Sequence, residues 1–177
     1  MAFLCYFVSK KTMLFGLGIA TALCILIEYI RLRFYPLNRW LIERFSLLLK
    51  PYEERHVTGQ TYFALGSFLT VLLFSKNIAI TSLVFLAVGD VAGVIAGAFF
   101  GKTKLFQKSL QGTGACWLAS LLTGVILHFT VVELKFYIIF VGALAAAFSE
   151  LLKIPPDDNL TMPLCTGAVM YLCVLLW

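Results

Sequence analysis

The chain has 177 residues, of which 61% are hydrophobic and 13% are charged. Together with a mean hydropathy of +0.95, this excludes an ordinary soluble globular protein, in which about a quarter of the residues carry charge. The formal net charge of +5 comes mainly from basic residues between the apolar runs. We therefore expect an all-α, polytopic membrane helix bundle that forms one integral membrane domain over residues 1–177.

Six apolar runs approach the roughly 20 residues that a helix needs to cross about 30 Å of hydrocarbon. We expect the first to be a retained helix, because no small-x-small cleavage site follows it. The scattered cysteines have no metal-ligand spacing and are expected to be buried apolar side chains. The predicted spans cover residues 13–30, 59–75, 78–98, 113–132, 136–152 and 161–177.

Most of the 14 basic residues fall in the segments 31–58, 99–112 and 153–160. Because lysine and arginine near membrane helices mark the cytoplasmic side, these segments are expected to face the cytoplasm. Both termini would then lie outside. The sequence thus predicts a multi-pass protein of the cytoplasmic (inner) membrane, with any site built from these loops open to the cytoplasm.

Segment 31–58 contains apolar residues at helical spacing between Pro36 and Pro51, with Arg39, Glu43 and Arg44 among them. This pattern favours one amphipathic helix lying in the lipid headgroup layer. The alternative is a cytoplasmic loop that packs on the bundle. The apolar positions are Leu37, Trp40, Leu41, Phe45 and Leu48.

The run GDVAGVIAGAFFG places glycine at every fourth position, at 89, 93, 97 and 101. Such a stripe lets a second helix pack closely inside a membrane, and it could equally serve a homodimer. Asp90 lies on the same face as Gly93 and Gly97 and should point into the bundle. A carboxylate at this depth is costly, so Asp90 is a candidate functional residue.

The loop GKTKLFQKSLQGTG leads into the fourth span and ends at the amino terminus of a helix, where free N–H groups and the helix dipole favour phosphate. Lys108, Ser109 and Thr113 add a cation and hydroxyl donors, and Gly112 allows close backbone approach. The alternative is that Lys108 only sets topology and that Ser109 or Thr113 is an ordinary N-cap.

The loop KIPPDDNLTMP leads into the sixth span in the same way. Asp157, Asp158 and Asn159 offer the oxygen ligands that Mg²⁺ accepts, although they could equally be N-cap residues. Glu150, near the end of the fifth span, is a second intramembrane acid. Glu28 is followed closely by Arg31, and a structural ion pair is the favoured interpretation.

These motifs resemble the CTP-dependent lipid-alcohol kinases, namely dolichol kinase, phytol kinase and the CTP-using diacylglycerol kinase. The likeness runs from about Thr58 to the carboxyl terminus, so residues 59–177 form the catalytic-motif region. FLAVGDVAGVIAGAFFGK resembles the family's Gly-Asp helix, KSLQGT its Lys-Ser-x-Glu-Gly-Ser loop, and IPPDDNLTMP its Asp-Asp-Asn-Leu-Thr-x-Pro motif.

The resemblance implies transfer of the terminal phosphate of CTP to a polyprenol, diacylglycerol or phytol hydroxyl, with Mg²⁺ as the metal. Asp90 and Glu150 would be the catalytic residues, with Asp90 acting as metal ligand or base. The nucleotide would be bound by Gly89, Lys102, Lys108, Ser109, Gly112 and Thr113. The metal would be bound by Asp90, Asp157, Asp158 and Asn159.

The chain departs from this family at two places. Gln111 stands where the family has an acid. Relatives begin with an extra helix carrying an Arg-Lys pair, whereas only MAFLCYFVSKK precedes the first span here. Two explanations are open: a start that lies too far downstream, or a shortened member, with or without activity.

Two other functions stay open. One is a phosphatidate cytidylyltransferase, which would use the same nucleotide and metal to make CDP-diacylglycerol. The other is a small membrane transporter in which Asp90 and Glu150 bind cations. The expected partners are the bilayer, CTP and a lipid alcohol, with no nucleic acid.

Overall fold

The computed structural model describes residues 8–44 and 51–176. Apart from one two-stranded hairpin, its regular elements are helices, which confirms the all-α class. The helices are α2 (Lys10–Arg33), α3 (Tyr35–Arg44), η1 (Pro51–Glu54), α4 (Gly59–Leu73), α5 (Lys76–Val84), η2 (Phe85–Asp90), α6 (Val91–Phe100), α7 (Leu110–Thr130), α8 (Phe136–Leu152) and α9 (Asp158–Leu176). The hairpin pairs β1 (Lys104–Leu105) with β2 (Lys108–Ser109).

All six predicted apolar runs fold as helices, but they differ in length. Within the described residues, four helical stretches are long and apolar enough to cross a membrane: Lys10–Arg33, Lys76–Phe100, Leu110–Thr130 and Asp158–Leu176. The other two, α4 and α8, are apolar but have only 15 and 17 residues. Six membrane spans therefore stay a prediction.

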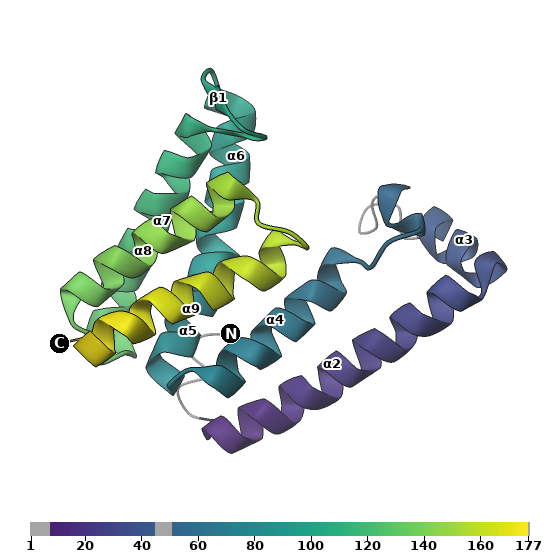
Figure 1. The fold of residues 1–177 in the computed structure, drawn as a ribbon, viewed down its shortest axis with the longest axis horizontal. Helices are drawn as coiled ribbons and strands as arrows, with labels where there is room; N and C mark the ends of the chain where they lie inside the picture. The colour runs from purple at the N-terminus through teal and green to yellow at the C-terminus, as the bar shows by residue number, and fades with distance from the viewer. Residues whose placement is uncertain (1–7, 45–50, 177) are drawn as a thin grey trace.

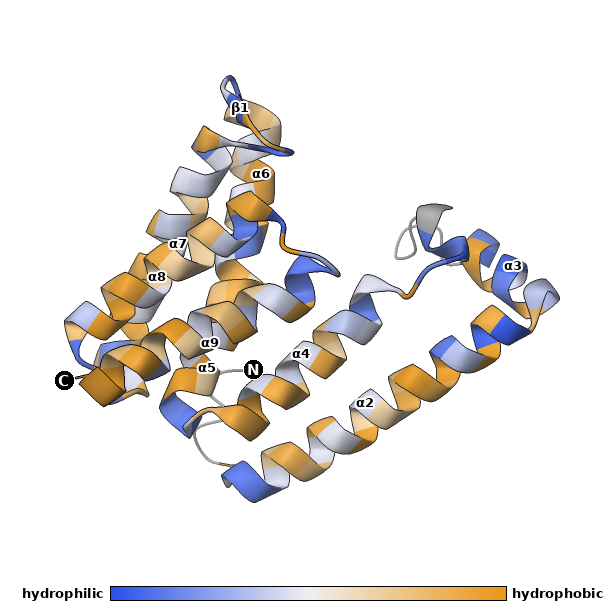
Figure 2. Cartoon of the chain, in the orientation of Figure 1, coloured by the Kyte–Doolittle hydropathy of each residue, from blue (hydrophilic) through white to orange (hydrophobic). Residues whose placement is uncertain are grey.

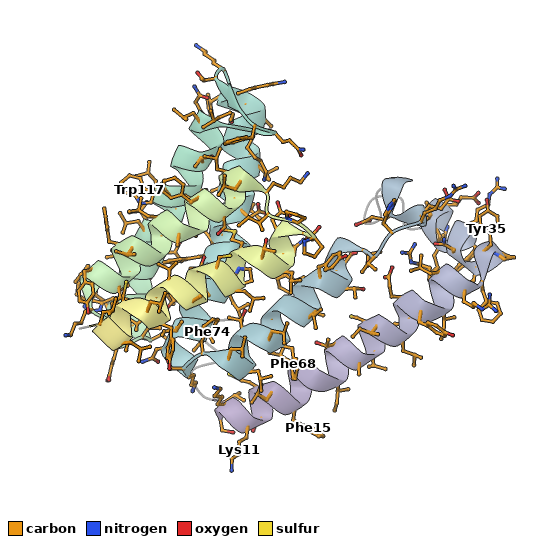
Figure 3. The ribbon with its side chains drawn as sticks, viewed as in Figure 1. Lys11, Phe15, Tyr35, Phe68, Phe74 and Trp117 are labelled. Carbon is orange, nitrogen blue, oxygen red and sulfur yellow. The ribbon has the colours of Figure 1, made fainter. Side chains whose placement is uncertain are left out.

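The helices form a main bundle and an arm. α7 packs against α6 and α8, and α9 packs against α8 and α4. α2 runs beside α4 on the outside of this bundle, and α3 folds back at its end (Figure 1). Figure 3 shows Phe68 of α4 on the side that faces α2, where it lies against Gly18, while Phe15 points away from the bundle.

Glycines let large apolar side chains fill the bundle centre. Phe85 is fully buried between α7 and α8, next to Gly124 and Gly142. The ring of Phe74, labelled in Figure 3, occupies the space beside Gly167 of α9 in the same way. This packing fixes the relative positions of the helices that carry the candidate site residues.

The predicted span 78–98 is not one regular α-helix. It begins as α5, passes through the π-helical segment η2 and continues as α6. A π-helical turn contains an extra residue, so it changes which face the following side chains present. Asp90 is the last residue of this segment, a feature that apolar periodicity alone does not predict.

The predicted amphipathic helix is present as α3. It begins at Tyr35, with Pro36 in its first turn, where a missing N–H costs nothing. Trp40 is exposed, as expected of an interfacial residue. Phe45 and Leu48 lie outside the described residues, and the position of α3 in the headgroup layer stays a prediction.

Many of the polar residues lie at the helix ends near the candidate site. Figure 2 shows hydrophilic residues on the β1 hairpin, in the segment that leads into α9 and around α3, whereas the helices between are largely hydrophobic. The segments predicted to face the cytoplasm, 31–58, 99–112 and 153–160, thus include the hairpin and the start of α9, which contribute to the candidate site.

Candidate site around Lys108

Three carboxylates surround the ammonium group of Lys108. Its Nζ lies 2.9 Å from Oε1 of Glu150, 3.5 Å from Oδ2 of Asp158 and 3.9 Å from Oδ1 of Asp90. These residues are widely separated in the sequence. The structure thus brings together four of the residues that the motifs single out.

Each member comes from a different element. Asp90 ends η2, Lys108 opens β2, Glu150 lies in the last turn of α8, and Asp158 begins α9. A left-handed residue, Lys153, ends α8 and turns the chain back toward α9. The site therefore depends on the packing of the whole bundle, not on one local motif.

Glu150 is the most enclosed member, with 1% of its side chain exposed. Its second oxygen, Oε2, accepts a hydrogen bond of 3.1 Å from the hydroxyl of Thr113. A buried carboxylate is stable only when its charge and oxygens are matched. Lys108 and Thr113 provide that match, so Thr113 supports Glu150 in the structure.

Lys108 keeps its charge in this surrounding. Burial by itself lowers the pKa of Lys108, but the hydrogen bond and charge of Glu150, with the charges of Asp158 and Asp90, outweigh burial and raise the pKa above its usual 10.5. The residue is therefore an ammonium ion at neutral pH. If all three carboxylates are ionised, the cluster carries an excess of negative charge.

Asp90 differs from Glu150 in its contacts. A quarter of its side chain is exposed, yet its Oδ1 atom is buried and accepts no hydrogen bond. An enclosed carboxylate oxygen without a hydrogen bond is unusual in a folded protein, and the ammonium group of Lys108, 3.9 Å away, is too distant to donate one. It suits an oxygen that binds a cation or a substrate hydroxyl.

The glycine stripe packs against α7, which confirms the predicted close approach. A Cβ on Gly93 would lie 3.3 Å from Cβ of Cys116 and 3.4 Å from Oε1 of Glu150, and one on Gly97 would lie 3.0 Å from Oγ of Ser109. Gly89 lies against Ser120 and Cys116 of α7, so it belongs to the same helix contact. A homodimer through the stripe stays a prediction.

A cavity of about 290 Å³ adjoins the cluster. One wall is the glycine face of α6, the other is the hairpin, and Glu150 of α8 also lines the cavity. Its lining residues are Gly93, Val94, Gly97, Gly101, Lys104, Gln107, Lys108, Ser109 and Glu150. The cavity is apolar along α6 and charged at Lys108, which suits a ligand with both characters.

At the start of α7, some of the groups predicted to bind phosphate already bond to each other. Oγ of Ser109 accepts a hydrogen bond from the backbone N–H of Gly112 at 3.1 Å, so Ser109 is the N-cap, as in the alternative interpretation. Gly112 also packs on the backbone of Gly93. Lys102 is exposed after α6 and takes part in none of the ion pairs among the described residues.

Asp157 and Asn159 are also engaged in capping. The backbone N–H and the side-chain amide of Asn159 both donate to Oδ1 of Asp157, at 3.0 and 2.8 Å. Within residues 8–44 and 51–176, no three His, Cys, Asp or Glu side chains are arranged to hold a metal ion by themselves. A metal at this site would therefore need further ligands besides these side chains.

The sequence does not predict a buried polar network that joins α2, α3 and η1. Arg31 forms an ion pair with Glu28 and donates to Oδ1 of Asn38 and to the backbone oxygen of Glu53. The ion pair itself was expected because Arg31 follows Glu28 closely, and the structure confirms it. The partners from α3 and η1 have no sequence signal, because they depend on how the chain turns back.

Comparison with known proteins identifies a similar chain of unassigned activity. Uncharacterized protein RP860 of Rickettsia prowazekii (strain Madrid E) is 26% identical over 166 residues, which cover 89% of this chain and 80% of that protein. No family model matches the chain, and no solved structure matches it.

Proposed function

We propose that the chain is a membrane-embedded kinase that transfers the terminal phosphate of CTP to the hydroxyl of a membrane lipid alcohol. The observation that carries the proposal is the ring of Asp90, Glu150 and Asp158 around Lys108. Phosphoryl transfer needs a cation to hold phosphate and carboxylates to bind metal or take a proton. These groups meet at one end of an apolar bundle, beside a cavity.

The residues fit a Mg²⁺ ion that is shared with the nucleotide. Magnesium sites at phosphates commonly use only one or two carboxylates, with phosphate oxygens and water as the other ligands. We assign Asp158 to this role, because it begins α9 and is partly exposed. When bound, Mg²⁺ would neutralise charge on the phosphates. The nucleotide would meet Lys108 from the polar end of the bundle.

We assign Asp90 to the acceptor hydroxyl. The lipid oxygen would form a bond to the γ-phosphorus of CTP, the bond from that phosphorus to the bridging oxygen would break, and CDP would leave. Asp90 would take the hydroxyl proton. Lys108 would hold the γ-phosphate, while Glu150 and Thr113 would keep its ammonium group in place.

We also propose how the chain is oriented in the membrane. It places the chain in the cytoplasmic membrane with six spans, the polar end facing the cytoplasm. The two shorter helices, α4 and α8, would cross where the bilayer adapts to their length. This orientation brings CTP from the cytoplasm and the lipid alcohol from the bilayer to the same cavity.

Purified full-length protein in mixed micelles would be incubated with Mg²⁺, a pool of polyprenol, diacylglycerol and phytol, and CTP labelled at the α- or γ-phosphate. Transfer of the γ-label alone to lipid supports the proposal. Transfer of the α-label with pyrophosphate release indicates a cytidylyltransferase, and no transfer also overturns the kinase. Asp90→Asn should slow transfer at least about a hundredfold, whereas Glu43→Gln, in an exposed ion pair of α3, should leave it unchanged.

A further inference from the structure

The hairpin between α6 and α7 has an unusual tip. Leu105 pairs with Lys108, so the loop contains only Phe106 and Gln107. Figure 1 shows the hairpin projecting beyond the ends of the two helices. The backbone φ of Phe106 is +55°, and Gln107 is not among the described residues with positive φ. Two-residue hairpin loops with this pattern normally place glycine first.

A bulky residue at positive φ is disfavoured, because its Cβ crowds the backbone. Glycine would satisfy the same turn without strain. The side chain of Phe106 gains little from the rest of the protein, since 71% of it is exposed. The loop geometry and the packing therefore give no reason for phenylalanine here, and an external contact can supply one.

The surroundings of Phe106 indicate what that contact is. Phe99, Phe100 and Leu105 are also exposed near this end of the molecule, and Lys102 and Lys104 are exposed beside them. No acidic residue occurs in the sequence between Asp90 and Glu133. Exposed aromatic side chains next to lysines match the apolar boundary and anionic headgroups of a bilayer surface.

The hairpin is also a wall of the cavity. Lys104, Gln107, Lys108 and Ser109 line it, opposite the glycine face of α6. Val94 of α6 lines the cavity too, and 55% of it is exposed. The position of the hairpin relative to the bilayer therefore decides at which depth the cavity opens.

We propose that Phe106 is a lipid anchor that seats the hairpin in the headgroup layer of an anionic bilayer. The anchored hairpin holds the mouth of the cavity level with the headgroups, so that a lipid hydroxyl reaches Lys108 without leaving the membrane. The anchoring needs no enzymatic activity, whereas the delivery of a hydroxyl rests on the proposed function.

The anchor is tested with full-length F106W protein in phosphatidylglycerol vesicles whose lipids carry bromine near the headgroup end of the acyl chains. The wild-type emission is subtracted to remove the native tryptophans. We expect quenching of at least half of the added emission and protection from acrylamide. Much weaker quenching in phosphatidylcholine vesicles supports the role of the lysines. Quenching by acrylamide without quenching by bromolipid overturns the proposal.

A second variant separates anchoring from folding. F106G removes the side chain and relieves the strained φ, so its melting temperature in detergent should equal or exceed that of the wild type. Its KM for the lipid acceptor should rise about tenfold, with kcat and the KM for CTP unchanged, and F106W should restore the low value. Unchanged lipid KM in F106G overturns delivery. If no variant transfers phosphate, the proposed function fails, while the quenching result still decides the anchor.

Discussion

The ammonium nitrogen of Lys108 lies 2.9 Å from Oε1 of Glu150, which ties the hairpin to the end of α8. Only 18% of the lysine side chain and 1% of the glutamate side chain are exposed. Breaking one half of such a pair leaves a buried charge without its partner. The pair should therefore contribute to stability as well as to the proposed chemistry.

Lys108→Met should lower the free energy of unfolding by about 3 to 5 kcal/mol, because Glu150, Asp90 and Asp158 lose their shared counter-ion. Denaturant unfolding in detergent measures this loss. The matched control is Arg39→Met, since Arg39 and Glu43 form an ion pair whose side chains are 66% and 65% exposed. That control should change stability little. Equal effects at the two sites would contradict the buried role of Lys108.

Alkaline pH should remove the same contribution in the wild type. Because the pKa of Lys108 is raised in the folded protein, its stabilisation is complete below the usual value of 10.5 and is lost as pH rises through the raised pKa. The difference in melting temperature between wild type and Lys108→Met should stay constant from pH 7 to 10 and shrink above that range. A difference that shrinks near neutral pH would contradict the raised pKa.

The sequence predicts most helices of the bundle, because the length of each apolar run indicates a helix. Runs such as 113–132 and 136–152 fold as α7 and α8 with only small shifts at their ends. The glycine period and Asp90 likewise indicate a close, polar helix contact. Helical periodicity could not predict the π-helical segment that ends at Asp90, since the spacing of apolar residues does not show where an extra residue enters a helix.

The sequence identifies most residues of the candidate site, but it does not predict how they are arranged in space. Charged residues in apolar surroundings identify Asp90, Glu150 and Lys108, because such residues are costly without a partner. Their common centre depends on four elements packing together. The capping roles of Ser109 and Asp157 were among the alternatives, and spacing alone could not decide between a cap and a ligand.

Gly112 and Gly114 offer a matched test of the contact between α6 and α7. A Cβ on Gly112 would lie 2.7 Å from the backbone oxygen of Gly93, whereas a Cβ on Gly114 would have no such neighbour within 4 Å. Gly112→Ala should therefore destabilise the protein by about 1 to 3 kcal/mol through overpacking. Gly114→Ala should stabilise it by up to about 1 kcal/mol through helix propensity. Thermal unfolding of both variants measures the contrast, and like-signed changes would exclude this packing.

Arg31 should be a structural residue of the first helices. Its guanidinium pairs with Glu28 and donates to Asn38 and to the backbone of Glu53 and His56. Arg31→Met should cost about 3 to 5 kcal/mol, because it leaves these buried groups unpaired. Arg33→Met, at an exposed position two residues later, should have little effect. Protease resistance of the α2–α4 segment, compared between the two variants, reports the loss locally.

Asp158 and Asp90 should respond differently to Mg²⁺ if their proposed roles are correct. Asp158 contacts Lys108 at 3.5 Å from the start of α9, where a carboxylate can share a metal with the phosphates of CTP. Asp158→Asn should raise the Mg²⁺ concentration for half-maximal transfer by roughly tenfold or more, because a metal ligand has lost its charge.

Asp90→Asn should instead lower kcat by about 10² to 10⁴ with an unchanged Mg²⁺ requirement, as expected when a base is lost. Initial rates over a Mg²⁺ series distinguish the two variants, and Glu43→Gln again serves as the control. A shift of the Mg²⁺ requirement in Asp90→Asn would reassign Asp90 to the metal. Equal shifts in both variants would mean that the two carboxylates bind it together.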